Sequence, residues 1–115
     1  MNESILTSIK KLLGLEEADT SFDPDLILHI NTIFFTLNQL GVGPDEPFRI
    51  TSKDETWDDF SDRKDIEAIK SYIYLKVRLL FDPPTNSAVL NAMTESAKEY
   101  EWRLNVAVDT NNINY

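Results

Sequence analysis

The side chains that could bind a metal ion are concentrated in one acidic run, residues 54–67. A calcium loop needs glycine at its sixth position and a bidentate glutamate at its twelfth, but counting from Asp54 these positions hold Asp59 and Asp65. A two-metal nuclease needs carboxylates that converge from separate elements, which this single run does not indicate. We interpret the run as a solvated face favoured by a helix dipole, and we expect no metal site. Its carboxylates are Asp54, Glu55, Asp58, Asp59, Asp62, Asp65 and Glu67.

No other residue pattern offers catalytic chemistry. His29 is the only histidine, and no nucleophile signature accompanies it, so a structural or surface role is favoured. The segment Gly41-Val42-Gly43-Pro44 lacks the length and the lysine of a phosphate-binding loop. Cysteine is absent, which excludes disulfides, thiolate zinc sites and thiol nucleophiles. We therefore expect no catalytic residue, no cofactor and no metal, and the chain is not predicted to be an enzyme.

The elements that carry these residues are predicted to be helices. Apolar residues at helical spacing indicate helices over residues 4–13, 23–40 and 62–81, and a last one from Asn86 or Ser87 to Leu104. A short helical turn with a cap is predicted at residues 56–60. The predicted fold is an all-α bundle of about four main helices, with a long loop between the second and the third. We expect a helical domain over residues 1–104 and an extended C-terminal tail over residues 105–115.

The second predicted helix is expected to be central. Asp23 is its expected N-cap, with proline following at the first helical position. Apolar residues occur on more than one face, so neighbours are expected to surround most of the helix. Its main stripe is Ile27, Ile30, Phe34, Leu37 and Leu40, and Leu26, Ile33 and Phe35 lie on other faces.

Length and charge narrow the possible functions. A chain of 115 residues fits one domain with one core. Its 20 acidic and 11 basic residues give a net charge of -9, which repels nucleic-acid phosphates and disfavours sequence-specific DNA reading. The N-terminus shows no apolar signal core. The most apolar stretch, residues 26–40, is too short and too polar to span a bilayer, so no membrane role is expected.

Several residues lie off the predicted core stripes and are candidates for a protein interface. Trp57, Phe60, Trp102 and Tyr115 are aromatics of the kind enriched at interfaces, although a tryptophan often belongs to its own core. Adjacent helix positions point in different directions, so part of the last helix must face outward. The full predicted interface set is Trp57, Phe60, Arg78, Trp102, Arg103, Val106, Val108, Ile113 and Tyr115.

Two stretches resemble a known family. The run from Tyr72 to Pro84, YIYLKVRLLFDPP, and the later Glu101-Trp102-Arg103-Leu104 resemble those of tailed-phage head-tail connector proteins. The order of elements, including the turn Trp57-Asp58-Asp59-Phe60, follows the same layout over nearly the whole chain. Each stretch is a packing or capping pattern, so their combination carries the resemblance.

The resemblance implies a structural virion protein. Such adaptors form a ring of about twelve copies under the portal protein, extend the DNA channel and receive a stopper or tail-completion protein. DNA passes through the channel without specific binding, which suits an acidic wall. The resemblance further implies assembly in the host bacterial cytoplasm and a final place at the head-tail junction. It assigns residues 62–81 to subunit packing and the tail to the portal or an adjacent protomer.

A different class of function remains open, namely an acidic inhibitor that mimics DNA and blocks a nucleic-acid-binding enzyme. Such a mimic is expected to spread its acids in a double row like that of a duplex. Here the acids are concentrated in residues 54–67 and are mixed with Arg63 and Lys64. The distribution of charge therefore favours the adaptor.

Overall fold

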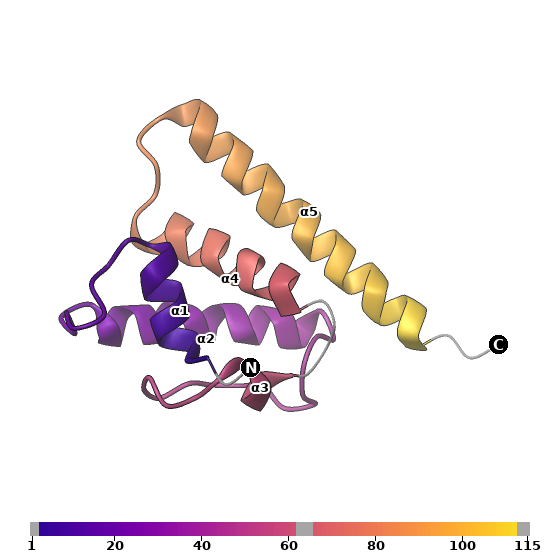
Figure 1. Ribbon diagram of the computed structural model, residues 1–115. Coiled ribbons are helices and arrows are strands. Elements are labelled where there is room, and N and C mark those ends of the chain that lie inside the picture. Colours follow the sequence, from indigo (N-terminus) through magenta and orange to yellow (C-terminus); the bar gives the residue numbers. More distant parts are fainter. Residues whose placement is uncertain (1–2, 62–65, 113–115) are drawn as a thin grey trace.

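The computed structural model describes residues 3–61 and 66–112, with side chains as far as residue 106. Figure 1 shows an all-helical chain, as predicted, in which α3 is a single turn and four longer helices form the body. In the described part of the chain, backbone pairing of the strand type is limited to one isolated bridge between Ser4 and Thr56. The helices are α1 (Ile5–Leu12), α2 (Asp23–Gln39), α3 (Trp57–Phe60), α4 (Ile66–Phe81) and α5 (Ser87–Asn112).

The core forms where α4 meets the other helices. α4 packs against α1, α2 and α5, and α1 also packs against α2. In Figure 1, α4 lies between α2 and the long α5. The core residues follow the predicted stripes of α1, α2 and α4, because helical residues three and four apart share one face. They include Ile5, Ile9, Leu26, Ile30, Ile33, Phe34, Leu37, Ile69, Tyr72, Ile73 and Val77.

The start of the chain is joined to α3 by backbone and side-chain hydrogen bonds. The N–H of Ile5 donates to the carbonyl of Glu55 at 3.0 Å, and the N–H of Trp57 donates to the carbonyl of Glu3 at 3.2 Å. The Trp57 side chain is 2% exposed, and its indole N–H donates to Ser8 Oγ at 3.0 Å. A buried indole N–H needs such an acceptor, so α1 and α3 form one packed unit.

The long loop after α2, residues 45–56, is held against α2 by side-chain hydrogen bonds and ring contacts. The Asn31 amide donates to the carbonyl of Ile50 at 2.9 Å and accepts from its N–H at 2.7 Å. Phe48 lies in an aromatic cluster, with ring centroids 5.1 Å from Phe34 and 5.5 Å from Phe60. These contacts fix the position of the loop beside α2, although its sequence has no helical periodicity.

The connector between α1 and α2 is held by a buried lysine. Lys10 is 3% exposed, and its ammonium donates to the carbonyls of Glu17 at 2.9 Å and Asp19 at 2.6 Å. Asp23, the predicted N-cap, instead lies in the first turn of α2 with Oδ1 2.9 Å from the ammonium. This contact is an ion pair without hydrogen-bond geometry, and Oδ1 accepts no hydrogen bond. The N-cap position is occupied by Phe22, which supplies no side-chain hydrogen bond. The Asp23 carboxylate instead faces the buried ammonium of Lys10, because a buried charge needs a partner of opposite sign.

The last helix is longer than predicted. α5 runs to Asn112, so the expected extended tail is wrong for residues 105–112, and the predicted boundary at residue 104 falls inside a helix. No glycine or proline interrupts this segment, and extending a formed helix fixes only one residue for each new hydrogen bond. Asn105 also donates from Nδ2 to the carbonyl of Leu40 at 3.2 Å, which ties α5 to the end of α2. Ile113 and Tyr115 lie outside the described residues.

The two tryptophans provide a matched test of this fold. Trp57→Ala removes a buried ring and is expected to lower the free energy of unfolding by about 3–5 kcal/mol. Trp102 is 67% exposed, so Trp102→Ala is expected to change it by less than about 0.5 kcal/mol. Urea unfolding followed by circular dichroism measures both values. Equal losses from the two substitutions would contradict the assignment of Trp57 to the core.

The dependence of stability on pH tests the contact between Glu3 and Ser8. The Ser8 hydroxyl lies 2.6 Å from Glu3 Oε1 and, with the nearby Lys70 ammonium, holds the pKa of Glu3 below its usual 4.5 against the opposing effect of burial. The charged carboxylate therefore stabilises the fold above about pH 4.5, and this contribution is lost as the pH falls through the lower folded-state pKa.

We expect Glu3→Gln to make the acid limb of a plot of melting temperature against pH shallower below pH 4.5. The control is Glu16→Gln, which removes an exposed connector carboxylate without touching Ser8. A wild-type slope in the Glu3 variant would show that this carboxylate is not linked to folding.

Candidate protein-interaction surface

Two of the predicted interface residues are buried within the protomer. Trp57 is 2% exposed and Phe60 is 4% exposed, so neither ring is available to a partner, and the expectation that they lie off the core is wrong. The cause is the capping box of α3, in which Thr56 Oγ1 accepts from the Asp59 N–H and the Asp59 carboxylate accepts from the Thr56 N–H. This box forms a helical turn, and a helical turn places residues three apart on one face.

Arg78 has a role inside the chain. Its side chain is 31% exposed, and Nε donates to the carbonyl of Asp82 at 2.7 Å. The guanidinium thus satisfies a carbonyl just after the C-terminus of α4, where a positive charge also complements the helix dipole. The remaining exposed part of the side chain is small.

Three of the predicted residues lie on the exposed side of α5. Trp102 is 67% exposed, Val106 is 39% exposed, and Arg103 is exposed with its guanidinium 2.7 Å from Glu99 Oε1. The buried residues Ala97 and Leu104 lie roughly opposite Trp102 around the helix, because successive residues turn by about 100°. Val108 lies within α5 as a backbone position only, since its side chain is outside the described part.

A hydrogen bond between helices fixes the rotation of α5 that turns Trp102 outward. The Tyr72 hydroxyl on α4 donates to Glu101 Oε2 at 2.6 Å, and Lys76 Nζ lies 3.6 Å from the same oxygen. Burial, and then the bond to the Glu101 carboxylate, raise the pKa of Tyr72 well above its usual value. The hydroxyl therefore remains a donor at physiological pH, and Glu101 is held next to α4 while Trp102 points away.

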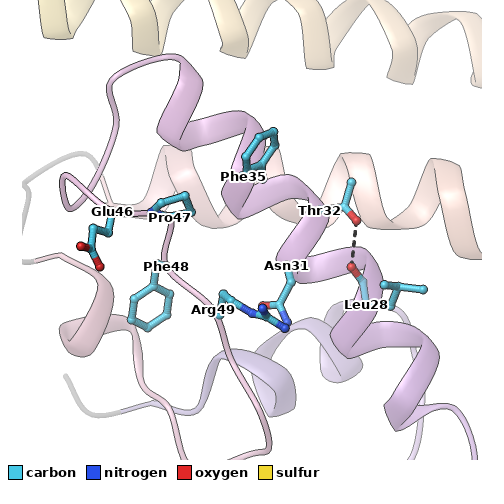
Figure 2. A pocket seen from close by; sticks show the side chains of 8 residues that line it. All are labelled: Leu28, Asn31, Thr32, Phe35, Glu46, Pro47, Phe48 and Arg49. Carbon is cyan, nitrogen blue, oxygen red and sulfur yellow. Dashed lines mark hydrogen bonds between the residues drawn. The ribbon is translucent and has the colours of Figure 1, made fainter.

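A groove lies between α2 and the loop after it. Figure 2 shows Leu28, Thr32 and Phe35 along one side of α2, with residues 46–49 of the loop running beside them. The groove has a volume of about 560 Å³. Leu28 is 64% exposed and Phe35 is 52% exposed, although the sequence predicted neighbours around most of α2. We call this hollow the α2 groove; its lining is Leu28, Asn31, Thr32, Phe35, Glu46, Pro47, Phe48 and Arg49.

The walls of the α2 groove are fixed by contacts inside the protomer. Asn31 holds the loop through Ile50, and Phe48 packs on Phe34. Glu46 and Arg49 are exposed at the groove, and neither forms a hydrogen bond or ion pair with any described residue. A preformed apolar hollow with unpaired charges at its edge is suited to receiving an apolar side chain flanked by charged ones.

Among the described residues of the acidic run, Glu55 orders the backbone of its own loop through hydrogen bonds. Glu55 accepts from the N–H groups of Thr51 at 2.9 Å and Ser52 at 3.2 Å. Burial acts to raise the pKa of Glu55, but the hydrogen bonds from Thr51 and Ser52 outweigh it and hold the pKa below its usual value. Asp62 and Asp65 lie outside the described residues.

Three other features of the described residues bear on metal binding, on the single histidine and on membrane insertion. Residues 3–61 and 66–112 contain no group of three histidine, cysteine or carboxylate side chains placed to hold a metal ion. His29 is half-buried on α2. Within the same ranges, none of the helices combines the length and the apolar character needed to cross a bilayer.

Comparison with known proteins gives one match. The model of a family described as phage connector protein matches residues 5–111, which is nearly the whole chain. No curated protein and no solved structure matches the chain. The match includes every helix from α1 to the penultimate residue of α5. The chain belongs to the phage connector protein family.

Proposed function

We propose that this chain is the adaptor of a tailed-phage head-tail junction, where it forms a ring under the portal protein, extends the DNA channel and docks a stopper or tail-completion protein. The observation that carries the proposal is the exposure of α5. This helix has 26 residues, yet only Ala97 and Leu104 are buried among its described side chains. A helix in water depends mainly on packing of one face, so such a helix is suited to partners on its other faces.

The protomer can fold before it finds those partners. The core of the described chain is formed by α1, α2, α3 and α4, by two residues between α2 and α3 and by a narrow strip of α5. A ring then forms on a template that presents many binding positions at once, because weak contacts between protomers add up when the copies are held together. The portal is the proposed template.

The charge of the chain suits a channel for DNA. A net charge of -9 repels the phosphate backbone, so DNA slides along such a wall without being gripped. Asp58 and Asp59, at the first turn of α3, are exposed acids of the described chain. DNA is therefore proposed as cargo of the channel rather than as a ligand.

The first prediction from this role concerns binding to heads. The purified chain is expected to be monomeric or weakly associated in sedimentation, and to add a ring of density at the portal vertex when mixed with DNA-filled heads. Cryo-electron microscopy of the mixture measures this, and heads without portal are the control. Absence of added density, together with tight binding to a nucleic-acid-binding enzyme, would favour the DNA-mimic inhibitor instead.

The second prediction concerns the end of α5. We propose that residues beyond Val106 contact the portal or an adjacent protomer. Among the described side chains of α5, Leu104 is the last buried one, and Asn105 bonds to the end of α2. Ending the chain after Val106 is expected to change the free energy of unfolding by less than about 1 kcal/mol and to abolish assembly on heads.

The matched variant for this truncation is Leu104→Ala, which removes a buried side chain and is expected to cost about 2–5 kcal/mol. Chemical denaturation and the head-binding assay are applied to both variants. Normal assembly of the shortened chain would remove the segment after Val106 from the docking mechanism.

A further inference from the structure

We propose that Trp102 of one protomer inserts into the α2 groove of the next protomer. This inference deepens the proposed function, because it names the contact between neighbouring copies of the ring. The contact has three requirements. The face of α5 that carries Trp102 and the α2 groove must lie on different sides of the protomer. They must also match in size and polarity, and their charges must be complementary.

The two surfaces lie on opposite sides of the fold. Leu28, Thr32 and Phe35 occupy the face of α2 that points away from its buried residues, and Trp102 occupies the face of α5 that points away from Leu104. α4 lies between α2 and α5 along most of their length, as Figure 1 shows, and the two helices meet where Asn105 bonds to Leu40. A protrusion on one side and a hollow on the other give a head-to-tail contact, which closes into a ring when the rotation per copy fits.

The α2 groove fits an indole in size and chemistry. Its volume of about 560 Å³ lies in the range that receives a large side chain with room beside it for a second one. Val106 lies one helical turn after Trp102 and is 39% exposed, so both can enter together. Leu28 and Phe35 offer apolar walls, and the unpaired Glu46 carboxylate can accept the indole N–H.

The charges around the two surfaces are complementary. Lys98 and Glu95 lie on the same face of α5 as Trp102 and are exposed, with side chains 66% and 74% accessible. The groove carries one unpaired acid, Glu46, and one unpaired base, Arg49. Docking can therefore place Glu46 near Lys98 and Arg49 near Glu95, which favours one register of the contact.

The surface area buried by this contact is too small to hold two free protomers together. A buried tryptophan contributes about 150–250 Å² of surface, whereas a stable interface buries about 800 Å² on each partner. The contact is therefore weak between two free copies. It becomes persistent when many copies are held side by side, as the proposed template does.

Cysteine cross-linking tests the contact directly, because the chain has no cysteine of its own. Gln39→Cys places a thiol on α2 one turn beyond Phe35, and Lys98→Cys places one on α5 one turn before Trp102. A short bismaleimide is expected to join a mixture of these two variants into dimers at high protein concentration, and to join the double variant into a ladder of larger species. The control uses Lys11→Cys in place of Gln39→Cys. Lys11 is exposed on α1, away from the α2 groove, and this variant is expected to give no dimer with Lys98→Cys.

Two substitutions identify the side chain responsible. Adding Trp102→Ala is expected to reduce the cross-linked product about tenfold or more, as removal of a central aromatic does at other interfaces. Val89→Ala, which truncates another exposed apolar residue of α5, is expected to leave the yield unchanged. Equal yields from Trp102→Ala and the parent variant would overturn the proposal, since Trp102 would then play no part.

The same variants separate this inference from the proposed function. Rings on heads that form normally with Trp102→Ala, without a link between residues 39 and 98, would overturn the contact and leave the adaptor role standing. A cross-link that depends on Trp102, with no ring on portal-bearing heads, would support the contact and contradict the adaptor role. Absence of both the link and the ring would overturn both.

Discussion

The packing of α4 between α2 and α5 is the constraint on which the rest of the structure depends. Ile69, Ile73 and Val77 are completely buried on this helix, and Tyr72 adds a buried ring whose hydroxyl reaches α5. A helix that packs against neighbours on two sides needs more than one narrow apolar stripe. The buried residues of α4 therefore extend over a wide arc of its surface, toward both α2 and α5. The result is a layered protomer in which α2 and α5 each keep one face free. The proposed interaction surfaces are the outer faces of α2 and α5.

Charged residues support this arrangement through backbone groups more than through pairs of side chains. Glu55 accepts from two N–H groups of its own loop, Asp59 closes the capping box of α3, and Arg78 binds a carbonyl beyond α4. Exposed ion pairs contribute little to stability, whereas a charged group that satisfies a free backbone donor or acceptor orders the segment around it. An acidic chain can therefore use several of its carboxylates for local structure and still carry a net charge of -9.

The sequence predicts the helices well, because the stripes of α1, α2 and α4 repeat at helical spacing and because Gly14, Gly41 and Pro83 interrupt them. It predicts the surface less well. The end of α5 has no apolar stripe, so its helix follows from propagation and from the bond between Asn105 and Leu40, which no local pattern reveals. The α2 groove depends on the pairing of Asn31 with Ile50 across a long loop, and a contact of this range is visible only in three dimensions. The spacing of Trp57 and Phe60 was the available signal that both rings face the core.

The buried ammonium of Lys10 limits which changes the connector between α1 and α2 can accept. Its two hydrogen-bond acceptors are main-chain carbonyls, of Glu17 and Asp19. The side chains of both residues are exposed, and that of Asp19 accepts hydrogen bonds from Ser21. The hydrogen bonds to Lys10 therefore do not depend on which side chains these two residues carry. They do depend on the length of the connector, because an insertion or deletion would carry the carbonyls away and leave the buried ammonium short of hydrogen-bond acceptors. An insertion or deletion in this connector is therefore expected to destabilise the fold more than a substitution at one of its exposed positions.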